Sequence, residues 1–538
     1  MAGLTLAIAR RRETERRALP PNLPALFAAG VARHRDAPFW RSVDGDGTVL
    51  TYGEFAALVD RCAAGFARFG IGRGTHVALA LPNLPVVGAA WIALQRLGAV
   101  AIGLNVNLVP HEVEYTLRTA DAAVLIVDRD YLGIFDGIAP ASAPVPEERI
   151  IVHGARPAGR RTGWEDLMAA ADRPVVGHSP DPAELASIIY TSGSMGLPKA
   201  AMLPHAWHTT SGWVRARQGP PVANILVDSP FYYMAAQWRF AMAMYLGAAV
   251  CVAARPTLAR YLDRLLDWGI DHCSASAQTA KLDDDPRYAR LRLGWVTSSG
   301  LPKALQGPLE ARLGAPVREI YGATEIGSAV VMPTLVTDMV GSGSCGMPDA
   351  FRRVRIVDAD GNDVRPGAAG ELWVAGQGIS LGYYNNPEAT AATHAGIWYR
   401  TGDLFECDGR GFYYWKSRIK DIIRRSKENI SAVEVETAVR AMPEVQDVCA
   451  LPVPDDHRDE EVKIYVQLVP GETAASVPPA RILTFARTML APFKVPRYIE
   501  YVAEFERTAS NKISKLALRR KKADLREGSW DAVADRWH

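Results

Sequence analysis

The chain has 538 residues, too many for one simple hydrophobic core, and we expect it to form several substructures. Hydrophobic residues make up 48% of the sequence and charged residues 22%, a balance that excludes a disordered or fibrous protein. Because 61 Lys and Arg nearly cancel 59 Asp and Glu, the formal charge of +2 gives no reason to expect nucleic acid as a partner.

The N-terminal segment and the cysteines indicate a cytoplasmic protein. Residues 1–17 place their arginines after a short apolar stretch, the reverse of a secretory signal, and we expect a solvated, frayed helix there. No uninterrupted apolar run reaches the roughly 18 residues that a membrane-spanning helix requires. The six cysteines are scattered, without the close pairs of a zinc site or a disulfide framework. We therefore expect a cytoplasmic chain with no membrane span.

Two stretches of the sequence predict parallel sheets covered by helices. Between residues 52 and 127, helical patterns alternate with short apolar runs such as HVALAL and AVLIV, as in βαβ units. The same rhythm returns between residues 224 and 321, where short apolar runs predict buried strands. This alternation assigns the chain to the α/β class.

The last part of the chain has a different pattern. After residue 341, Gly-rich turns separate alternating apolar residues, which predicts antiparallel hairpins and a small β-barrel. Residues 431–445 predict a helix, 461–469 a strand and 512–538 a charged helix, so we expect a small α+β domain at the end. We place the boundary between a large N-terminal region, residues 1–418, and this C-terminal domain, residues 419–538.

A loop rich in Gly and Ser, YTSGSMGLPKA at residues 190–200, follows a strand-like run. Its N–H groups and hydroxyls can surround a phosphate oxygen, while Lys199 supplies positive charge. A P-loop would need Gly-Lys-Ser/Thr at its end, whereas Pro198 precedes Lys199 here. For a single loop, a flexible surface turn is the alternative. The predicted phosphate cradle consists of Thr191, Ser192, Gly193, Ser194, Gly196 and Lys199.

The loop resembles the signature of the adenylate-forming superfamily, which includes acyl-CoA synthetases, the adenylation domains of peptide synthetases and firefly-type luciferases. Met195 replaces the second Thr of that signature. Further motifs follow in the family's order: SSGLP (298–302), YGATE (321–325), GELWVAG (370–376), GYYNNPEAT (382–390), YRTGDL (399–404), SRIKD (417–421) and ERTASNKISK (506–515). With RRSKENIS at residues 424–431, the nearest resemblance is to bacterial acyl-CoA ligases of the crotonobetaine/carnitine or medium-chain type. It implies an AMP-binding adenylation domain at 1–418 and a mobile lid at 419–538.

The resemblance implies an ATP site built from these motifs. Each motif taken alone is also compatible with an ordinary turn or a solvated salt bridge. The residues expected to contact adenine and ribose are Ser299, Gly300, Tyr321, Gly322, Asp403 and Arg418. Thr324 is expected to contact the α-phosphate, and Glu325 to hold Mg²⁺.

The C-terminal domain is implied to supply a catalytic lysine, Lys512, and a hinge at Lys420. A cation that bridges the acid and the triphosphate stabilises the charge that builds up as the carboxylate attacks phosphorus. Asn511 stands where the family has Gly, and Asn also tolerates a left-handed backbone. For Lys512, the alternative is one surface lysine among many in a basic tail.

SPFYYMAAQW, residues 229–238, resembles the family segment that lines the acid pocket, with Tyr232 and Tyr233 in place of Phe-His. Gln237 is a candidate reader of a polar substituent on the acid, with core packing as the alternative. RRSKENIS, residues 424–431, has Lys427 where such ligases have Gly beside the tunnel for the second substrate. This lysine either obstructs CoA or pairs with its phosphates.

Three hypotheses of function remain open. The first is an AMP-forming acid–CoA ligase that uses ATP, Mg²⁺ and CoA. The second is a ligase that transfers the acyl group from the adenylate to an amine, as an amide synthetase does, or to a carrier-protein thiol. The third is a non-catalytic protein that binds acyl-adenylates or nucleotides, and Met195 and Lys427 support it. The joint presence of four residues argues against it: Lys199, Glu325, Asp403 and Lys512. The expected partner is a small carboxylic acid, and a homodimer is left open.

Overall fold

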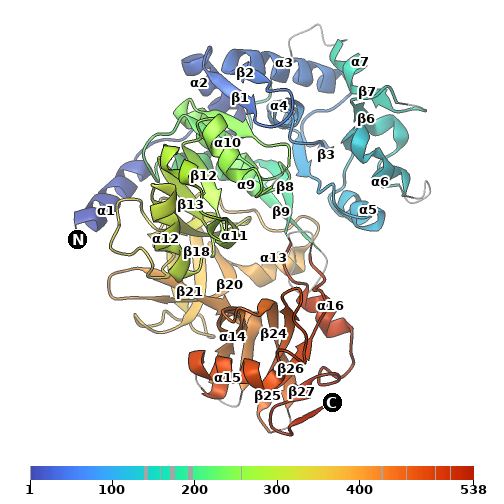
Figure 1. Cartoon of the computed structure of the whole chain (residues 1–538). Coiled ribbons are helices and arrows are strands. Elements are labelled where there is room, and N and C mark those ends of the chain that lie inside the picture. Colours follow the sequence, from blue (N-terminus) through green and yellow to red (C-terminus); the bar gives the residue numbers. More distant parts are fainter. Residues whose placement is uncertain are drawn as a thin grey trace.

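The computed structural model describes residues 2–138, 143–157, 159–169, 175, 177–191, 198–255, 257–425, 428–455, 457–490, 492–508 and 511–538. Figure 1 shows a large body formed by the blue, green and yellow parts of the chain. The orange and red C-terminal part lies at one end of this body. The large body contains three sheets, and the C-terminal part contains a fourth.

The first sheet has the strand order β7-β6-β5-β3-β4-β8-β9. All its neighbouring strands pair in parallel except β8 and β9, which are antiparallel. The sheet confirms the βαβ pattern predicted for residues 52–127. Its strands are β3 (His76–Ala80), β4 (Val100–Gly103), β5 (Val124–Asp128), β6 (Ile150–His153), β7 (Thr162–Gly163), β8 (Leu185–Thr191) and β9 (Lys199–Pro204).

The second sheet has the order β16-β15-β14-β13-β12-β10-β11-β1-β2, with a parallel centre and antiparallel edges. It contains all the buried strands predicted between residues 224 and 321. Its strands are β1 (Pro38–Ser42), β2 (Val49–Thr51), β10 (Asn224–Val227), β11 (Ala249–Val252), β12 (His272–Ala275), β13 (Trp295–Ser298), β14 (Val317–Ala323), β15 (Gly327–Val331) and β16 (Met347–Pro348).

Helices cover both parallel sheets, and their apolar faces form the largest core. The fully buried aromatic side chains in this core include Trp40, Trp91, Trp207 and Phe240. The helices of the large body are α1 (Ala2–Glu15), α2 (Leu23–His34), α3 (Tyr52–Arg68), α4 (Pro85–Arg96), α5 (Pro110–Thr119), α6 (Leu132–Asp136), α7 (Trp164–Ala169), α8 (His205–Ala216), α9 (Met234–Leu246), α10 (Tyr261–Asp267), α11 (Ala277–Ala280), α12 (Lys303–Leu313) and α13 (Pro387–Thr393).

The third sheet is antiparallel and has five strands, in the region where the sequence predicts hairpins and a small barrel. The guanidinium group of buried Arg352 joins it to the second sheet by donating to the carbonyl oxygens of Ile326, at 2.8 Å, and Ser328, at 3.0 Å. The turn between β14 and β15 is thereby held against the third sheet. Its strands are β17 (Arg352–Val357), β18 (Gly370–Gly376), β19 (His394–Ala395), β20 (Trp398–Cys407) and β21 (Tyr413–Arg418).

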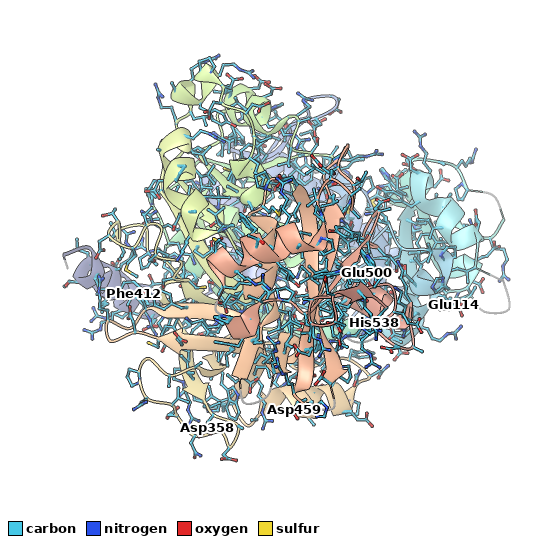
Figure 2. The ribbon with its side chains drawn as sticks, turned by 60° about the horizontal axis from the view of Figure 1, so that its bottom comes forward. Glu114, Asp358, Phe412, Asp459, Glu500 and His538 are labelled. Carbon is cyan, nitrogen blue, oxygen red and sulfur yellow. The ribbon has the colours of Figure 1, made fainter. Side chains whose placement is uncertain are left out.

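The C-terminal part has a hydrophobic core of its own, formed by residues between 423 and 499. In Figure 2 this part faces the viewer and carries the labelled Glu500 and His538. Its strands are β22 (Ile422–Arg425), β23 (Glu428–Ser431), β24 (Val445–Asp455), β25 (Asp459–Leu468), β26 (Tyr498–Tyr501), β27 (Trp530–Asp531) and β28 (Arg536–Trp537). Its helices are α14 (Ala432–Arg440), α15 (Pro479–Met489) and α16 (Lys515–Arg520).

Both ends of the chain differ from the sequence-based expectation. The helix predicted for residues 512–538 is wrong beyond α16, because β27 and β28 form a hairpin that extends the sheet. The expected N-terminal helix is present as α1 and several of its residues are exposed, but it is held against the body rather than frayed. Helix α1 packs on the body, where Trp213 Nε1 donates to the carbonyl oxygen of Thr14 at 3.0 Å and the Phe351 amide donates to Glu15 at 3.0 Å.

None of the helices in the described part of the chain combines the length and the apolar character needed to cross a membrane. The six cysteines are free thiols, and five of them are buried. Buried thiols of this kind pack as small apolar side chains.

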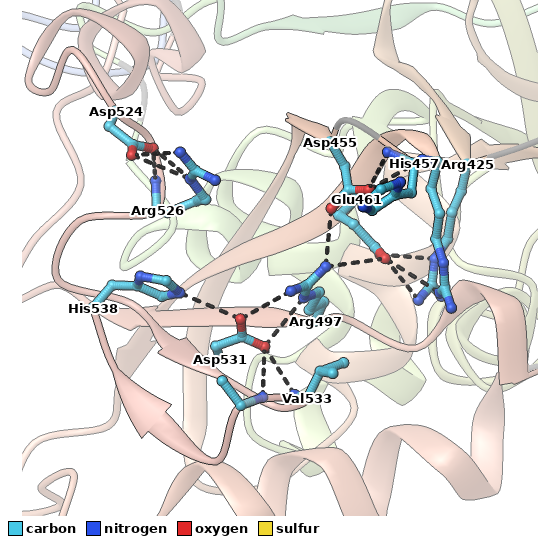
Figure 3. Close-up of polar contacts among 12 residues, drawn as sticks. Arg425, Asp455, His457, Glu461, Arg497, Asp524, Arg526, Asp531, Val533 and His538 are labelled. Carbon is cyan, nitrogen blue, oxygen red and sulfur yellow. Dashed lines mark hydrogen bonds and ion pairs between the residues drawn. The ribbon is translucent and has the colours of Figure 1, made fainter.

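A network of ion pairs holds the C-terminal hairpin in place (Figure 3). Arg497 binds both carboxylate oxygens of Asp531 at 3.1 Å and also contacts Asp455 at 2.9 Å. Asp531 accepts further bonds from the Val533 amide at 2.8 Å and from His538 at 3.3 Å. Burial of Asp531 raises its pKa, but these hydrogen bonds outweigh burial and lower the pKa to about 2.

We predict that Asp531→Asn destabilises the C-terminal part by about 1–3 kcal/mol, because it leaves Arg497 without its bidentate partner. Asp524→Asn is the matched control, since its partner Arg526 is two residues away and both side chains are largely exposed. Thermal unfolding of the two variants tests this prediction.

The pH dependence gives a second readout of the same variant. A carboxyl whose pKa falls from about 3.9 to a lower value on folding stabilises the protein above the unfolded pKa. The contribution of Asp531 should therefore be complete above about pH 4 and be lost as the pH falls towards 2. Equal unfolding temperatures for both variants at neutral pH would contradict the prediction.

Candidate active site

Four of the sequence motifs lie at or beyond the carboxyl ends of strands that have a parallel neighbour, which is where ligands bind in open α/β sheets. The loop after Thr191 follows β8, and the aromatic segment at residues 229–238 follows β10. Ser299 and Gly300 follow β13, and Thr324 and Glu325 follow β14. Each of these segments thus follows a strand of one of the two parallel sheets.

The expected adenine wall is held by Glu319, a side chain that the sequence analysis missed. Its carboxylate accepts from Ser298 Oγ at 2.6 Å, from the Gly300 amide and from the Leu301 amide at 3.4 Å. Gly300 has φ of +70°, and a Cβ atom there would meet no other atom within 4 Å. The wall therefore has a fixed backbone and an open face.

Glu319 and Tyr321 lie two residues apart on β14, so both project from one face of the strand. This period of two was the sequence signal that could have identified Glu319. Burial raises the pKa of the Glu319 carboxyl.

Gly322 follows Tyr321 on the same strand. A Cβ atom on Gly322 would lie 2.1 Å from the carbonyl oxygen of Gly327, so the tight turn into β15 requires glycine there.

Asp403 is 2% exposed and lies at the centre of a polar cluster. One carboxylate oxygen accepts from Trp415 Nε1 at 3.1 Å and pairs with Arg418 at 2.8 Å, while the other accepts the Tyr321 hydroxyl at 2.5 Å. The structure thus brings Tyr321, Asp403 and Arg418 together. A carboxylate has about four acceptor positions, so three are used in this arrangement.

The ring of Tyr321 packs edge-on against Phe405, with 4.7 Å between the ring centroids. Its hydroxyl group occupies an acceptor of Asp403 that the sequence analysis assigns to ribose. A bidentate contact from Asp403 to two ribose hydroxyls therefore requires the Tyr321 hydroxyl to give up one of these positions.

Glu325 is 6% exposed, and its Oε1 accepts a hydrogen bond from the Tyr383 hydroxyl at 2.7 Å. Among the residues that the structure describes, no group of three or more His, Cys, Asp or Glu side chains is arranged to hold a metal ion. Mg²⁺ in nucleotide sites is commonly bound by one or two carboxylates together with substrate phosphates. A single carboxylate at Glu325 fits that pattern.

Near the aromatic segment, the rings of Tyr232 and Tyr233 lie edge to face, with 4.7 Å between their centroids. Asn107 Nδ2 donates to the Tyr232 hydroxyl at 3.1 Å. Gln237 is 3% exposed, donates to the carbonyl oxygen of Phe231 at 3.2 Å, and shares a cavity wall with Tyr232 and Trp91. The cavity offers about 10 Å³ to the centre of a water molecule, which is room for a single water.

Part of the predicted site lies outside the described residues. Ser192, Gly193, Ser194 and Gly196 of the phosphate loop, together with Lys427, belong to this group. Thr191 ends β8 and Lys199 begins β9, so both ends of the loop are described.

Lys420 and Lys512 belong to the C-terminal region. Lys420 lies in a short 3₁₀ turn, Ile419–Asp421, directly after β21. Lys512 is exposed in a turn before α16, where the Thr508 amide donates to its carbonyl oxygen at 2.7 Å. Asn511 has φ of +60°, which confirms the left-handed backbone expected at that position.

Three curated relatives span nearly the whole chain. A benzoate–CoA ligase of Thauera aromatica is 29% identical over 506 residues, covering 88% of this chain and 91% of the relative. A feruloyl-CoA synthase of Amycolatopsis sp is 31% identical over 516 residues, covering 91% and 98%. A crotonobetaine/carnitine–CoA ligase of Proteus sp. is 26% identical over 511 residues, covering 90% and 96%.

Two solved structures share the fold. An anthranilate CoA ligase in complex with anthranoyl-AMP has a TM-score of 0.80 at 22% identity, covering 94% of this chain and 98% of that one. An amide bond synthetase from Marinactinospora thermotolerans, solved as a lysine-to-alanine mutant, has a TM-score of 0.78 at 21% identity, covering 93% and 100%.

Two family profiles match successive parts of the chain. The profile described as AMP-binding enzyme matches residues 27–384, and the one described as AMP-binding enzyme C-terminal domain matches residues 434–512. The first match alone spans more than half of the 538 residues. The chain therefore belongs to the AMP-binding enzyme family.

Proposed function

We propose that this protein is an ATP-dependent, AMP-forming ligase that joins a carboxylic acid to coenzyme A. In the first step, a carboxylate oxygen bonds to the α-phosphorus of ATP and pyrophosphate leaves, which yields an acyl-adenylate. In the second step, the CoA thiol gives its proton to solvent and its sulfur bonds to the acyl carbon. The bond between that carbon and the phosphate oxygen breaks, and AMP leaves. The names of the benzoate, feruloyl and crotonobetaine/carnitine relatives support the proposal.

One observation carries the ATP half of the proposal, namely the convergence of two loops of the second sheet and strand β20 of the third sheet. The Gly300 loop supplies a wall for adenine, Asp403 supplies an acceptor for ribose, and Glu325 supplies a carboxylate. The hydrogen bond between Tyr321 and Asp403 joins the second and third sheets at this point. Mg²⁺ bound at Glu325 would neutralise charge on the phosphates and the leaving pyrophosphate.

Lys199 and Lys512 supply positive charge from two different directions. Lys199 begins the strand that leaves the phosphate loop, where an ammonium group can pair with phosphate oxygens. Lys512 lies on the C-terminal part, and we propose that it neutralises the repulsion between the acid carboxylate and ATP during adenylation. Its exposure in the described arrangement leaves it free to approach the site when the C-terminal part moves.

We propose that residues 1–418 form the adenylation domain and 419–538 a lid that turns about Lys420. The turn that contains Lys420 follows Arg418, whose side chain pairs with Asp403, so the proposed hinge begins at the ribose site. Asp421 pairs with Lys515 at 3.6 Å, three residues after Lys512. Hinges absorb motion over a few residues at the ends of elements, which fits this position.

An aromatic acid is the substrate class that the pocket supports best. The edge-to-face pair of Tyr232 and Tyr233 presents ring surfaces at the carboxyl end of β10. The cavity beside Gln237 is too narrow for an acid as it stands, so Tyr232 or Gln237 must move if the acid enters there. Several relatives are named for aromatic acids, among them benzoate, 3-hydroxybenzoate and ferulate.

An amine acceptor is the second candidate for the final step. Lys427 favours it, because a long cationic side chain replaces the glycine that lines the CoA tunnel in the ligases the motifs resemble. The likeness in fold to an amide bond synthetase agrees with this candidate. Adenylation is common to both candidates.

We expect purified protein with ATP and Mg²⁺ to release pyrophosphate only when an acid is present, and fastest with an aromatic acid. Pyrophosphate release should be measured over a panel of aromatic and aliphatic acids, with mass spectrometry of the products formed with CoA or with amines. Release without thioester would exclude the CoA ligase, and amide formation would establish the second candidate. ATP binding without release for any acid would favour the non-catalytic protein.

Lys512→Ala should slow pyrophosphate release by about 10²–10³-fold, the range seen when one group that stabilises a transition-state charge is removed. Lys521→Ala is the matched control, because Lys521 is exposed on the same basic tail. Conversion of synthetic acyl-adenylate to thioester should be retained in both variants. Equal pyrophosphate release by the two variants would remove Lys512 from the mechanism.

Lys427→Gly should raise thioester formation several-fold if the lysine obstructs the CoA tunnel. Pyrophosphate release trapped with hydroxylamine should stay unchanged, because the residues proposed for adenylation lie elsewhere. A lower rate with CoA would instead mean that Lys427 binds CoA phosphates. An unchanged rate would show that the lysine does not affect CoA.

A further inference from the structure

Residues 380–384 form a strap between two parts of the proposed ATP site. On one side the strap pairs with β9, which begins at Lys199: the Met202 amide donates to the Gly382 carbonyl oxygen at 2.9 Å, and the Tyr384 amide donates to Ala200 at 2.8 Å. On the other side, the Ser380 amide donates to the Glu325 carbonyl oxygen at 2.7 Å. The backbone thus connects the phosphate-loop strand to the Glu325 turn.

Tyr383 is the side chain that this strap places between Lys199 and Glu325. It is 5% exposed, and its hydroxyl group donates to Glu325 Oε1 at 2.7 Å. The Lys199 ammonium nitrogen lies 5.1 Å from the centroid of the same ring, within the range of a cation–π contact. One tyrosine therefore contacts both the cation and the carboxylate.

A second tyrosine fixes the direction of the hydrogen bonds. The hydroxyl groups of Tyr383 and Tyr399 lie 3.2 Å apart. Because the single proton of Tyr383 is donated to Glu325, Tyr399 must be the donor to Tyr383. A tyrosine hydroxyl has an ordinary pKa of about 10, so it is protonated and can donate at neutral pH.

We propose that Tyr383 is a positioning residue that orients Glu325 for Mg²⁺ and keeps Lys199 apart from that carboxylate before the nucleotide binds. The bond to Oε1 restrains one carboxylate oxygen and leaves Oε2 outside this bond. The ring of Tyr383 holds the Lys199 ammonium group on its face. Lys199 and Glu325 therefore do not form an ion pair, which would make both unavailable to the nucleotide and Mg²⁺. This inference rests on the proposed function, because it assigns Mg²⁺ to Glu325 and phosphate to Lys199.

Tyr383→Phe separates the two roles, since it keeps the ring and removes the hydroxyl group. Calorimetric titration of ATP into the protein, with and without Mg²⁺ and with no acid, measures binding in the absence of turnover. We expect the strengthening of ATP binding by Mg²⁺ to fall about tenfold in this variant, as for a lost hydrogen bond to a charged group. Binding of ATP without Mg²⁺ should change less than twofold.

Tyr383→Leu removes the ring as well, which allows Lys199 to approach Glu325. We expect it to weaken ATP binding both with and without Mg²⁺. Tyr384→Phe is the matched control, because its hydroxyl group donates to Asp121 at the surface, at 3.0 Å. This control should bind ATP as the unchanged protein does.

Kinetics distinguish positioning from a general loss of structure. In Tyr383→Phe, the Mg²⁺ concentration for half-maximal pyrophosphate release should rise, while kcat at saturating Mg²⁺ and the KM for the acid stay close to those of the unchanged protein. Tyr399→Phe should show a smaller shift in the same direction and serves as the test if Tyr383→Phe does not fold.

The same dependence on Mg²⁺ in the Tyr383→Phe and Tyr384→Phe proteins would overturn the inference, while the proposed function would stand. The result is different if the unchanged protein binds no ATP under either condition. In that case the proposed function fails, and the inference fails with it.

Discussion

The buried guanidinium group of Arg352 is the contact on which the geometry of the site depends. It donates to the carbonyl oxygens of Ile326 and Ser328, which lie one and three residues after Glu325. Arg352 itself is the first residue of β17 in the third sheet. Burial lowers its pKa to about 10, so it remains charged at neutral pH. Carbonyl dipoles satisfy this charge, and losing one partner would leave a buried donor unpaired at a cost of about 1–3 kcal/mol. The second and third sheets are thereby locked together at the point where Tyr321 reaches Asp403.

Much of the fold could be predicted from the sequence because its strands are short apolar runs between turn residues. The strands at residues 76–80 and 124–128 are of this kind, and their parallel pairing follows from the intervening helices. The C-terminal hairpin could not be predicted, because Asp531 is held by Arg497, a contact that leaves no local pattern. The basic composition after residue 512 favoured a helix, and a long-range contact determined the outcome instead.

In the site, too, residues in local motifs could be predicted, and residues that act through long-range contacts could not. Asp403, Glu325 and Gly300 were predictable, since each lies in a motif with a recognisable turn. Glu319 and Tyr383 were missed: the period of two on β14 indicates only which face Glu319 lies on, and the contacts that the two side chains make appear only when separate segments are brought together. Glu319 fixes the backbone at Gly300, and Tyr383 contacts Glu325 across 58 residues of sequence. The phosphate loop and Lys427 lie outside the described residues, so their roles rest on the motifs.

The central claim is that the acid is activated through its own oxygen as an acyl-adenylate. The most direct measurement uses an acid labelled with ¹⁸O in both carboxylate positions, incubated with ATP, Mg²⁺ and CoA. Mass spectrometry of the nucleotide product should find one ¹⁸O in the phosphate of AMP, because a carboxylate oxygen stays on phosphorus when the acyl group leaves. Unlabelled AMP, or ADP as the nucleotide product, would contradict the account.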